Sequence, residues 1–177
     1  MIKGIKRRFN LYLINHMREL HHFKLKLWLI NRIPGVHMGE GSKIVGKVVL
    51  SNVNLTTGKN CFLNRDVYFY GNGNVTIGDN VDIAPGVAFL TGGHLIGTSE
   101  HRAGEGIIGS MKIGDGSWIG CRAMLMDKDG KGLTIGFGDV IAAGALVNKN
   151  TEPDCLYAGV PAVKKKELSK ETIESKL

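Results

Sequence analysis

The sequence predicts an all-β fold in which short strands stack into a triangular prism. Aliphatic residues recur every six positions over about 110 residues, and a small residue follows most of them. Glycine accounts for 25 of the 177 residues and proline for only 4, which indicates many tight corners rather than a disordered chain. A period of six is neither helical nor a simple alternation, so each coil of the prism would consist of three short strands.

The coils are predicted to begin at positions 38, 57, 77, 113 and 135. The spacing between successive coil starts is mostly close to the length of three six-residue repeats, but the spacing from Ile77 to Ile113 is 36 residues. Residues 90–112, which break the repeat, are therefore predicted to form a long loop inserted into one coil. Long loops on a regular scaffold often carry function, and this one contains His94 and His101.

Three segments are expected along the chain: residues 1–35, 36–162 and 163–177. In the first, apolar residues spaced by threes and fours predict an amphipathic helix over residues 2–20, whereas residues 23–30 fit either a helix or a strand. The middle segment is the prism itself. The last begins with three lysines and is predicted to be a tail with a short helix, whose charged face would be solvated.

The positive charge of the protein belongs to its N-terminal segment. Residues 1–32 hold eight Lys and Arg residues and one acidic residue, while the rest of the chain holds fifteen of each sign. A nucleic-acid-binding domain would spread its charge over the binding surface, so no nucleic-acid partner is expected. Two interpretations of residues 1–32 remain open: a membrane-surface helix, and a cap over the exposed strand edges of the prism.

The cysteines and the hydropathy pattern bear on localisation. The three cysteines show neither a CxxC motif nor a zinc-binding spacing, which favours reduced thiols in the cytoplasm and no bound metal. Apolar runs remain far shorter than the roughly 18 uncharged residues that a membrane span requires. The expected localisation is cytoplasmic, with peripheral association at the inner face of the membrane as the alternative that the basic segment leaves open.

The repeat carries specific motifs: "GDGSWIG" at 114–120, "IAAGALV" at 141–147 and "LYAGVPA" at 156–162. With these motifs the chain resembles the hexapeptide-repeat acyltransferases. It is similar to maltose and galactoside acetyltransferases, and the N-terminal segment and inserted loop look closer to capsule and exopolysaccharide O-acetyltransferases. The resemblance implies a left-handed parallel β-helix of about five coils and a homotrimer. It also implies direct transfer of acetyl from acetyl-CoA to a hydroxyl of a carbohydrate acceptor, such as a bacterial surface polysaccharide or its precursor.

Acetyl transfer to a hydroxyl needs a base for the departing proton and a donor for the oxyanion. His94, in "LTGGH", matches the place of the family's catalytic base; a loop histidine bonded to backbone is the alternative. Asn64 matches an asparagine that faces the reacting centre, where its amide would stabilise the oxyanion or fix the sugar hydroxyl. Its alternative role is a corner residue that tolerates positive φ.

Four further residues are candidates for acceptor binding. Asp66 would share the site with Asn64 if the coil directs it outward. Trp118 matches a tryptophan beside the catalytic histidine, and it could equally shield a sheet face or a subunit seam. His101 and Arg102 in the inserted loop could position a glycan, but an exposed histidine and a surface ion pair are equally good interpretations.

Coenzyme A requires backbone amides for its pantetheine arm and cations for its phosphates. Cys121 and Ala143 match pantetheine-contacting places of the family, and each follows a small residue that would let a ligand approach the backbone. The family usually has a basic residue directly after "GVPA", where this chain has Val163. The phosphate contact is therefore expected to shift to Lys164 or Lys166.

Two rival functions fit the same prism. A γ-type carbonic anhydrase would need three histidines around zinc, and the repeat region offers His37, His94 and His101, of which His37 lies coils away from the others. A non-catalytic glycan-binding trimer would need none of this chemistry, and it predicts no interaction with coenzyme A.

Overall fold

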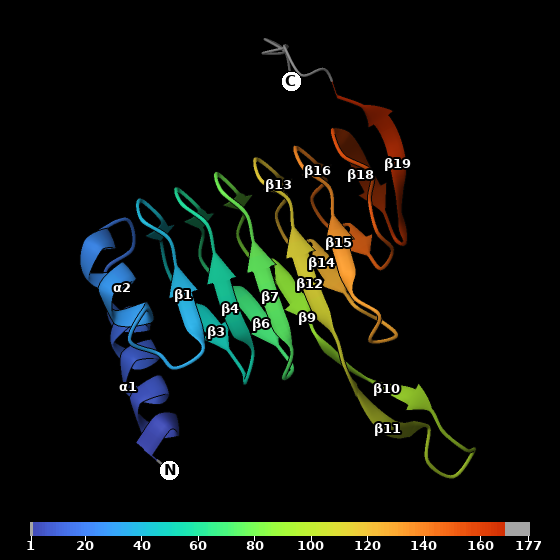
Figure 1. Cartoon of the computed structure of the whole chain (residues 1–177), viewed down its shortest axis with the longest axis horizontal. Helices are drawn as coiled ribbons and strands as arrows, with labels where there is room; N and C mark the ends of the chain where they lie inside the picture. The colour runs from blue at the N-terminus through green and yellow to red at the C-terminus, as the bar shows by residue number, and fades with distance from the viewer. Residues whose placement is uncertain (1, 169–177) are drawn as a thin grey trace.

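The computed structural model describes residues 2–168 and confirms a left-handed parallel β-helix. Figure 1 shows a prism of stacked strands with two helices at its N-terminal end and a hairpin that projects from its side. Each coil contributes one strand to each of three faces, here named A, B and C.

Each face is a sheet of stacked parallel strands. Face A contains β1 (Val36–Met38), β4 (Asn54–Thr57), β7 (Asn74–Ile77), β12 (Ser110–Ile113) and β15 (Leu133–Ile135). Face B contains β2 (Lys43–Ile44), β5 (Phe62–Leu63), β8 (Asp82–Ile83), β13 (Trp118–Ile119), β16 (Val140–Ile141), β18 (Cys155–Gly159) and the antiparallel β19 (Ala162–Glu167). Face C contains β3 (Val48–Leu50), β6 (Val67–Tyr70), β9 (Ala88–Leu90), β14 (Met124–Met126) and β17 (Leu146–Val147).

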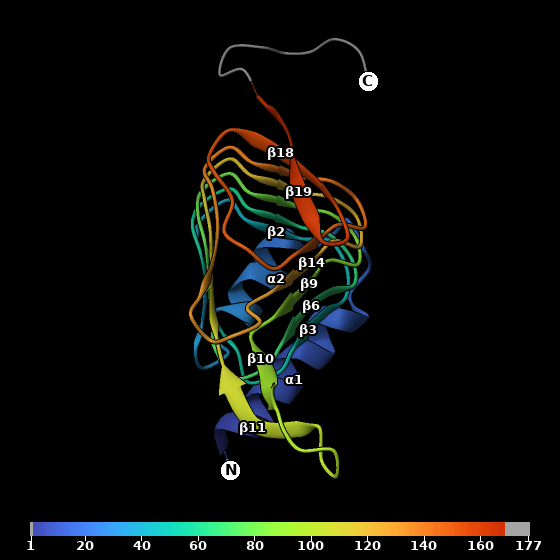
Figure 2. The ribbon, with the colours of Figure 1, turned by 90° about the vertical axis from the view of Figure 1, so that its right-hand side faces the viewer.

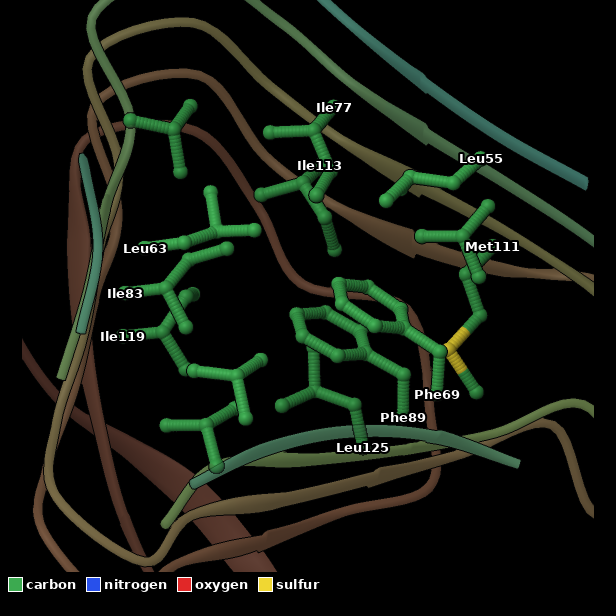
Figure 3. Close-up of a cluster of buried hydrophobic side chains, with 14 of the residues drawn as sticks. Leu55, Leu63, Phe69, Ile77, Ile83, Phe89, Met111, Ile113, Ile119 and Leu125 are labelled. Carbon is green, nitrogen blue, oxygen red and sulfur yellow. The ribbon is translucent and has the colours of Figure 1, made fainter. Parts of the chain in front are cut away.

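The strand register confirms the predicted starts of the coils. The residues at positions 38, 57, 77, 113 and 135 are successive partners on face A. The aliphatic residue of each six points inward, as Figure 3 shows for Leu63, Ile83 and Ile119. Phe69 and Phe89 stack in the core with ring centroids 4.7 Å apart and planes 5° apart.

Coil stacking also explains the small residue that follows each aliphatic one. A Cβ added at Gly78 would lie 2.8 Å from the backbone nitrogen of Asp115 in the next coil. Real Cβ atoms do not approach backbone that closely, so a side chain here would push neighbouring coils apart.

The N-terminal segment forms two helices, α1 (Ile2–His16) and α2 (Phe23–Ile30). The first helix ends at His16 and is shorter than the predicted span of residues 2–20, and Leu20 and His22 adopt positive φ in the turn between the helices. The helical alternative is confirmed for residues 23–30.

The two helices cover the open end of the first coil with side chains that substitute for a missing strand. Asn15 donates to the carbonyl of Val48 (3.0 Å) and accepts from its N–H (2.9 Å). Asn31 makes the same paired contact with Met38, and the buried Lys26 donates to the carbonyl of Val45 at 2.6 Å. An uncovered strand edge would leave these backbone groups without partners, so the helices act as a cap.

Two predicted segments differ in the structure. The insertion at 90–112 is largely an ordered antiparallel hairpin of β10 (Gly92–Ile96) and β11 (Ala103–Ile108), rather than an irregular loop. Residues 163–167 belong to β19, which pairs with β18, so the predicted C-terminal helix is wrong for these residues. Pairing with β18 extends face B at the last coil, and this tertiary contact outweighs the helical tendency of the charged sequence. Residues 169–177 lie outside the described residues.

No helix within residues 2–168 combines the length and the apolar composition that crossing a membrane requires.

Candidate active site

The corner residues between faces B and C stack into one edge of the prism, here named the B–C edge. The N–H of Gly86 donates to the carbonyl of Arg65 (3.1 Å), and that of Arg122 donates to Pro85 (2.9 Å). One coil further, the N–H of Gly144 donates to the carbonyl of Cys121 at 2.8 Å. The stacking therefore brings the corners that carry the predicted Asn64, Asp66, Cys121 and Ala143 onto a single line.

A hollow of about 350 Å³ lies on face B beside this edge, and both Asn64 and Trp118 line it. Trp118 projects outward with 49% of its surface exposed. The Oδ1 atom of Asn64 accepts the N–H of Arg65 at 2.9 Å, which orients the amide. The Nδ2 group of Asn64 is a hydrogen-bond donor, which suits a developing oxyanion.

A second hollow of about 410 Å³ lies around the B–C edge and contains Asp66 and Cys121. Two cations that the sequence analysis missed, Arg65 and Arg122, line the same hollow. Each directly follows a predicted site residue in the chain. Its position at a corner of the six-residue repeat could therefore have identified it from the sequence. Arg65 also pairs with Glu19 at 3.1 Å, with both side chains about half exposed.

His94 lies on β10, exposed and away from both hollows. Its Nδ1 atom is 2.9 Å from the carbonyl oxygen of Gly104 on the opposite strand. A carbonyl only accepts hydrogen bonds, so Nδ1 carries the proton, and in the neutral ring Nε2 has a free lone pair. The contact fixes the tautomer that a general base needs, because the unprotonated nitrogen points away from the hairpin's own backbone.

A single chain does not bring His94 together with Asn64 and Trp118. The hairpin leaves the prism between β9 on face C and β12 on face A, whereas Asn64 lies between faces B and C. Figure 2 shows β10 and β11 extending away from the body of the prism. Within residues 2–168 of one chain, the base and its predicted partners therefore occupy different edges.

His101 and Arg102 lie in the turn at the tip of the hairpin. The backbone N–H of His101 donates to Thr98 at 3.2 Å, and its ring is exposed. The guanidinium of Arg102 donates to the carbonyl of Gly97 at 3.2 Å, across the same turn. Arg102 therefore stabilises the hairpin turn in this structure, and neither residue lines the two hollows.

The lysines predicted to bind phosphate lie on β19, the outermost strand of face B. Lys164 contacts Glu152 at 2.8 Å and Glu167 at 3.0 Å. These carboxylates, Glu152 first, hold the pKa of Lys164 well above its ordinary value. The charge of Lys164 is thus already compensated by its neighbours, and Lys166 lies opposite Leu156 in the register of β18.

The small residues before the pantetheine candidates have a different cause from the one expected. A Cβ at Gly120 would lie 2.6 Å from the backbone nitrogen of Ala143, so glycine is required by the next coil rather than by a ligand. Cys121 is exposed at the B–C edge, whereas Cys61 and Cys155 are buried. Burial raises the pKa of Cys61, which favours its neutral thiol and a packing role.

The residues described here contain no cluster of three or more His, Cys, Asp or Glu side chains arranged to hold a metal ion. His37 lies on β1 in the first coil, at the end of the prism that the helices cover.

This architecture defines a left-handed β-helix protein with a histidine on a projecting hairpin. The chain is 34% identical over 125 residues to the galactoside O-acetyltransferase of Escherichia coli K12, an alignment that covers 70% of this chain and 60% of the relative. The chain thus spans about 60% of that relative's length. No protein-family model matches the sequence.

Solved structures extend the similarity over nearly the whole chain. A hexapeptide-repeat acetyltransferase from Vibrio cholerae superposes with a TM-score of 0.79 at 26% identity, covering 96% of this chain and 94% of that one. A galactoside acetyltransferase in complex with coenzyme A superposes with a TM-score of 0.79 at 28% identity, covering 94% and 82%. Over nearly its whole length the chain is therefore similar in fold to the hexapeptide-repeat acetyltransferases.

Proposed function

We propose that this protein is an O-acetyltransferase that moves an acetyl group from acetyl-CoA to a sugar hydroxyl. The observation that carries the proposal is the tautomer of His94, since its Nδ1–H is held by Gly104 and its Nε2 is available as a base. Similar proteins support the donor: the Vibrio cholerae acetyltransferase has been solved with acetyl-CoA, and the galactoside acetyltransferase with coenzyme A.

In the proposed reaction, Nε2 of His94 removes the proton of the acceptor hydroxyl as the oxygen attacks the thioester carbonyl. The amide of Asn64 donates to the resulting oxyanion, and the thiolate of coenzyme A leaves as the carbonyl reforms. The imidazolium then returns its proton to the departing sulfur. Trp118 would contact the acceptor and shield the reacting groups from water.

This mechanism needs a second subunit, and we propose a homotrimer. Face C has an outward row that is apolar in every coil: Val49, Tyr68, Ala88 and Leu146, which are half-buried, and Met124, which is exposed. The matching row on face A is polar: His37, Thr56, Thr76, Lys112 and Thr134. Apolar outward residues favour face C as a subunit contact, because packing would remove them from water.

Packing through face C would bring the hairpin of one subunit toward the B–C edge of its neighbour. The site would then combine His94 of one chain with Asn64 and Trp118 of the next. Coenzyme A would run along that edge past Cys121 and Ala143 toward Lys166, which lies in the same register row as Trp118.

The acceptor belongs to the same proposal. A galactoside O-acetyltransferase is among the relatives, and we propose as acceptor a carbohydrate of a bacterial surface polysaccharide or its precursor. The exposed Arg65 and Arg122 and the half-buried Asp66 offer polar groups for a hydrated, hydroxyl-rich ligand. A cytoplasmic location fits the supply of acetyl-CoA and the three free thiols.

The test is coenzyme A release from acetyl-CoA in the presence of a panel of sugars and surface glycans. His94→Ala should lower kcat by roughly 10²- to 10⁴-fold, the usual contribution of a general base. His101→Ala, seven residues along the same hairpin, serves as the matched control and should change kcat only slightly. A His94→Ala enzyme that keeps wild-type acetyl transfer would remove the proposed mechanism.

A further inference from the structure

Helix α1 has two stripes of residues on opposite faces. The inner stripe, with the buried Asn10 and Ile14, packs against the end of the prism. The outer stripe consists of Ile5, Phe9 and Tyr12, whose exposed fractions are 62%, 61% and 59%. Their spacing of four and three residues aligns them on one side of the helix. Capping the prism uses only the inner stripe, so the cap does not account for the outer one.

Basic side chains flank the outer stripe on both sides. At about 100° per residue, Lys6 and Arg8 lie to either side of Ile5, Phe9 and Tyr12, and both are exposed. Charge outside residues 1–32 sums to zero, so the net positive charge of the protein is concentrated in this helical layer. An apolar stripe bordered by cations matches a surface that is apolar within and anionic at its boundary.

The second helix adds to the same layer. Trp28 and Leu25 on α2 are exposed at 52% and 45%, and the guanidinium of Arg32 lies 3.8 Å above the Trp28 ring. Tryptophan and tyrosine suit a boundary between apolar and aqueous phases because each has a large apolar ring with one polar group.

We propose that the outer stripe of α1 binds the surface of an anionic lipid bilayer, with α1 lying in the plane of the interface. The helix can do so without unfolding, because Asn15 and the inner stripe keep their contacts with the prism. Both helices lie at one end of the prism (Figure 1). In the proposed trimer, with prisms side by side, three copies would face the same bilayer and bind cooperatively. The bilayer contact itself does not require acetyl transfer.

The experiment measures co-sedimentation of the full-length protein with vesicles of phosphatidylglycerol and phosphatidylcholine, and with vesicles of phosphatidylcholine alone. Binding should require phosphatidylglycerol and weaken as salt rises, because surface charges are screened. The triple variant Ile5→Ser, Phe9→Ser, Tyr12→Ser should bind at least roughly tenfold more weakly, since three side chains no longer enter the interface.

Two controls separate the stripe from general effects. Phe137→Ser with Val160→Ser removes exposed apolar residues at the opposite end of the prism and should leave vesicle binding unchanged. Lys6→Glu with Arg8→Glu should abolish the preference for phosphatidylglycerol, whereas Lys128→Glu with Lys149→Glu, an equal change of charge elsewhere, should not.

The proposal is overturned if the wild-type protein does not bind the anionic vesicles, or if the triple variant binds as well as the wild type. It is also overturned if the triple variant changes the oligomeric state, because the stripe would then be a contact between subunits. Since vesicle binding is read without acetyl-CoA, its failure leaves the acetyltransferase proposal standing, and loss of transfer in His94→Ala leaves the bilayer contact standing.

Discussion

The cap on the first coil can be tested with the single change Asn15→Ala. The Asn15 amide substitutes for a strand: it donates to the carbonyl of Val48 at 3.0 Å and accepts from the Val48 N–H at 2.9 Å. The Val48 residue is fully buried, so the variant leaves one donor and one acceptor without protein partners. Each orphaned group costs about 1–3 kcal/mol, and water that enters the space of the half-buried amide would recover part of this. We expect a loss of about 2 kcal/mol.

The assay is thermal unfolding at fixed protein concentration, because subunit assembly would couple stability to concentration. A loss of about 2 kcal/mol corresponds to a decrease in Tm of roughly 4–8 °C for a chain of this size. Asn54→Ala is the matched control, since the amide side chain of Asn54 donates to the exposed Asn74 side chain at 2.9 Å rather than to buried backbone. Its Tm should change by less than about 2 °C. Equal Tm values for the two variants would refute the view that the helices cap the prism through these amides.

Three further variants test the prism itself. Gly120→Ala should destabilise the protein by about 1–3 kcal/mol in urea unfolding, because the added Cβ would meet the backbone of the next coil. A Cβ added at Gly106 would meet no other atom, so Gly106→Ala is the control, and equal effects of the two variants would contradict the prediction. Asp127→Asn should lower the unfolding free energy by about 1–3 kcal/mol, because the buried carboxylate accepts the N–H groups of three residues. The control Asp129→Asn changes an exposed carboxylate and should be neutral. Similar urea midpoints for the two variants would argue against this role of Asp127. Desolvation lowers the pKa of Lys26 below its ordinary 10.5, so the unfolded chain binds its proton more tightly than the folded one. The unfolding free energy of the wild type relative to Lys26→Met should therefore rise with pH between the lowered pKa and 10.5. A difference that stays constant or falls over this range would contradict a lowered pKa for Lys26.

The periodicity of the sequence was sufficient to predict the coils. Each six marks an inward residue, and the register at Met38, Thr57, Ile77, Ile113 and Ile135 follows from repetition alone. A repeat can be recognised in this way because each coil contacts mainly its neighbours, so local pattern and tertiary structure coincide.

The ends of the prism were harder to predict, because non-local contacts decide their structure. Residues 163–167 are rich in lysine and read as a solvated helix, yet they pair with the exposed edge of β18. The capping contacts of Asn15 and Lys26 could not be predicted either, because nothing in the sequence marks the backbone groups that these side chains bind. The hairpin at 92–108 lacks the period of six. This break in the repeat located the insertion, but it did not predict the two strands within it.

The candidate site was predictable only in part. Asn64, Cys121 and Ala143 share one edge because all three are corner residues of the repeat. Arg65 and Arg122 were missed because an arginine at a corner reads as an ordinary solvated charge. The orientation of the His94 ring depends on a carbonyl ten residues away across the hairpin, which no local pattern reveals.

A mixed-subunit experiment tests the shared site most directly. His94→Ala and Asn64→Ala chains, each nearly inactive alone, are co-expressed in equal amounts with different tags, and the mixed trimers are isolated and assayed for acetyl transfer. If one chain supplies the histidine and its neighbour the asparagine, every mixed trimer regains about a third of its sites, because only one of its three interfaces joins an intact histidine to an intact asparagine. Recovery of that order is the predicted result. Mixed trimers no more active than the two parent variants would contradict a site built between subunits.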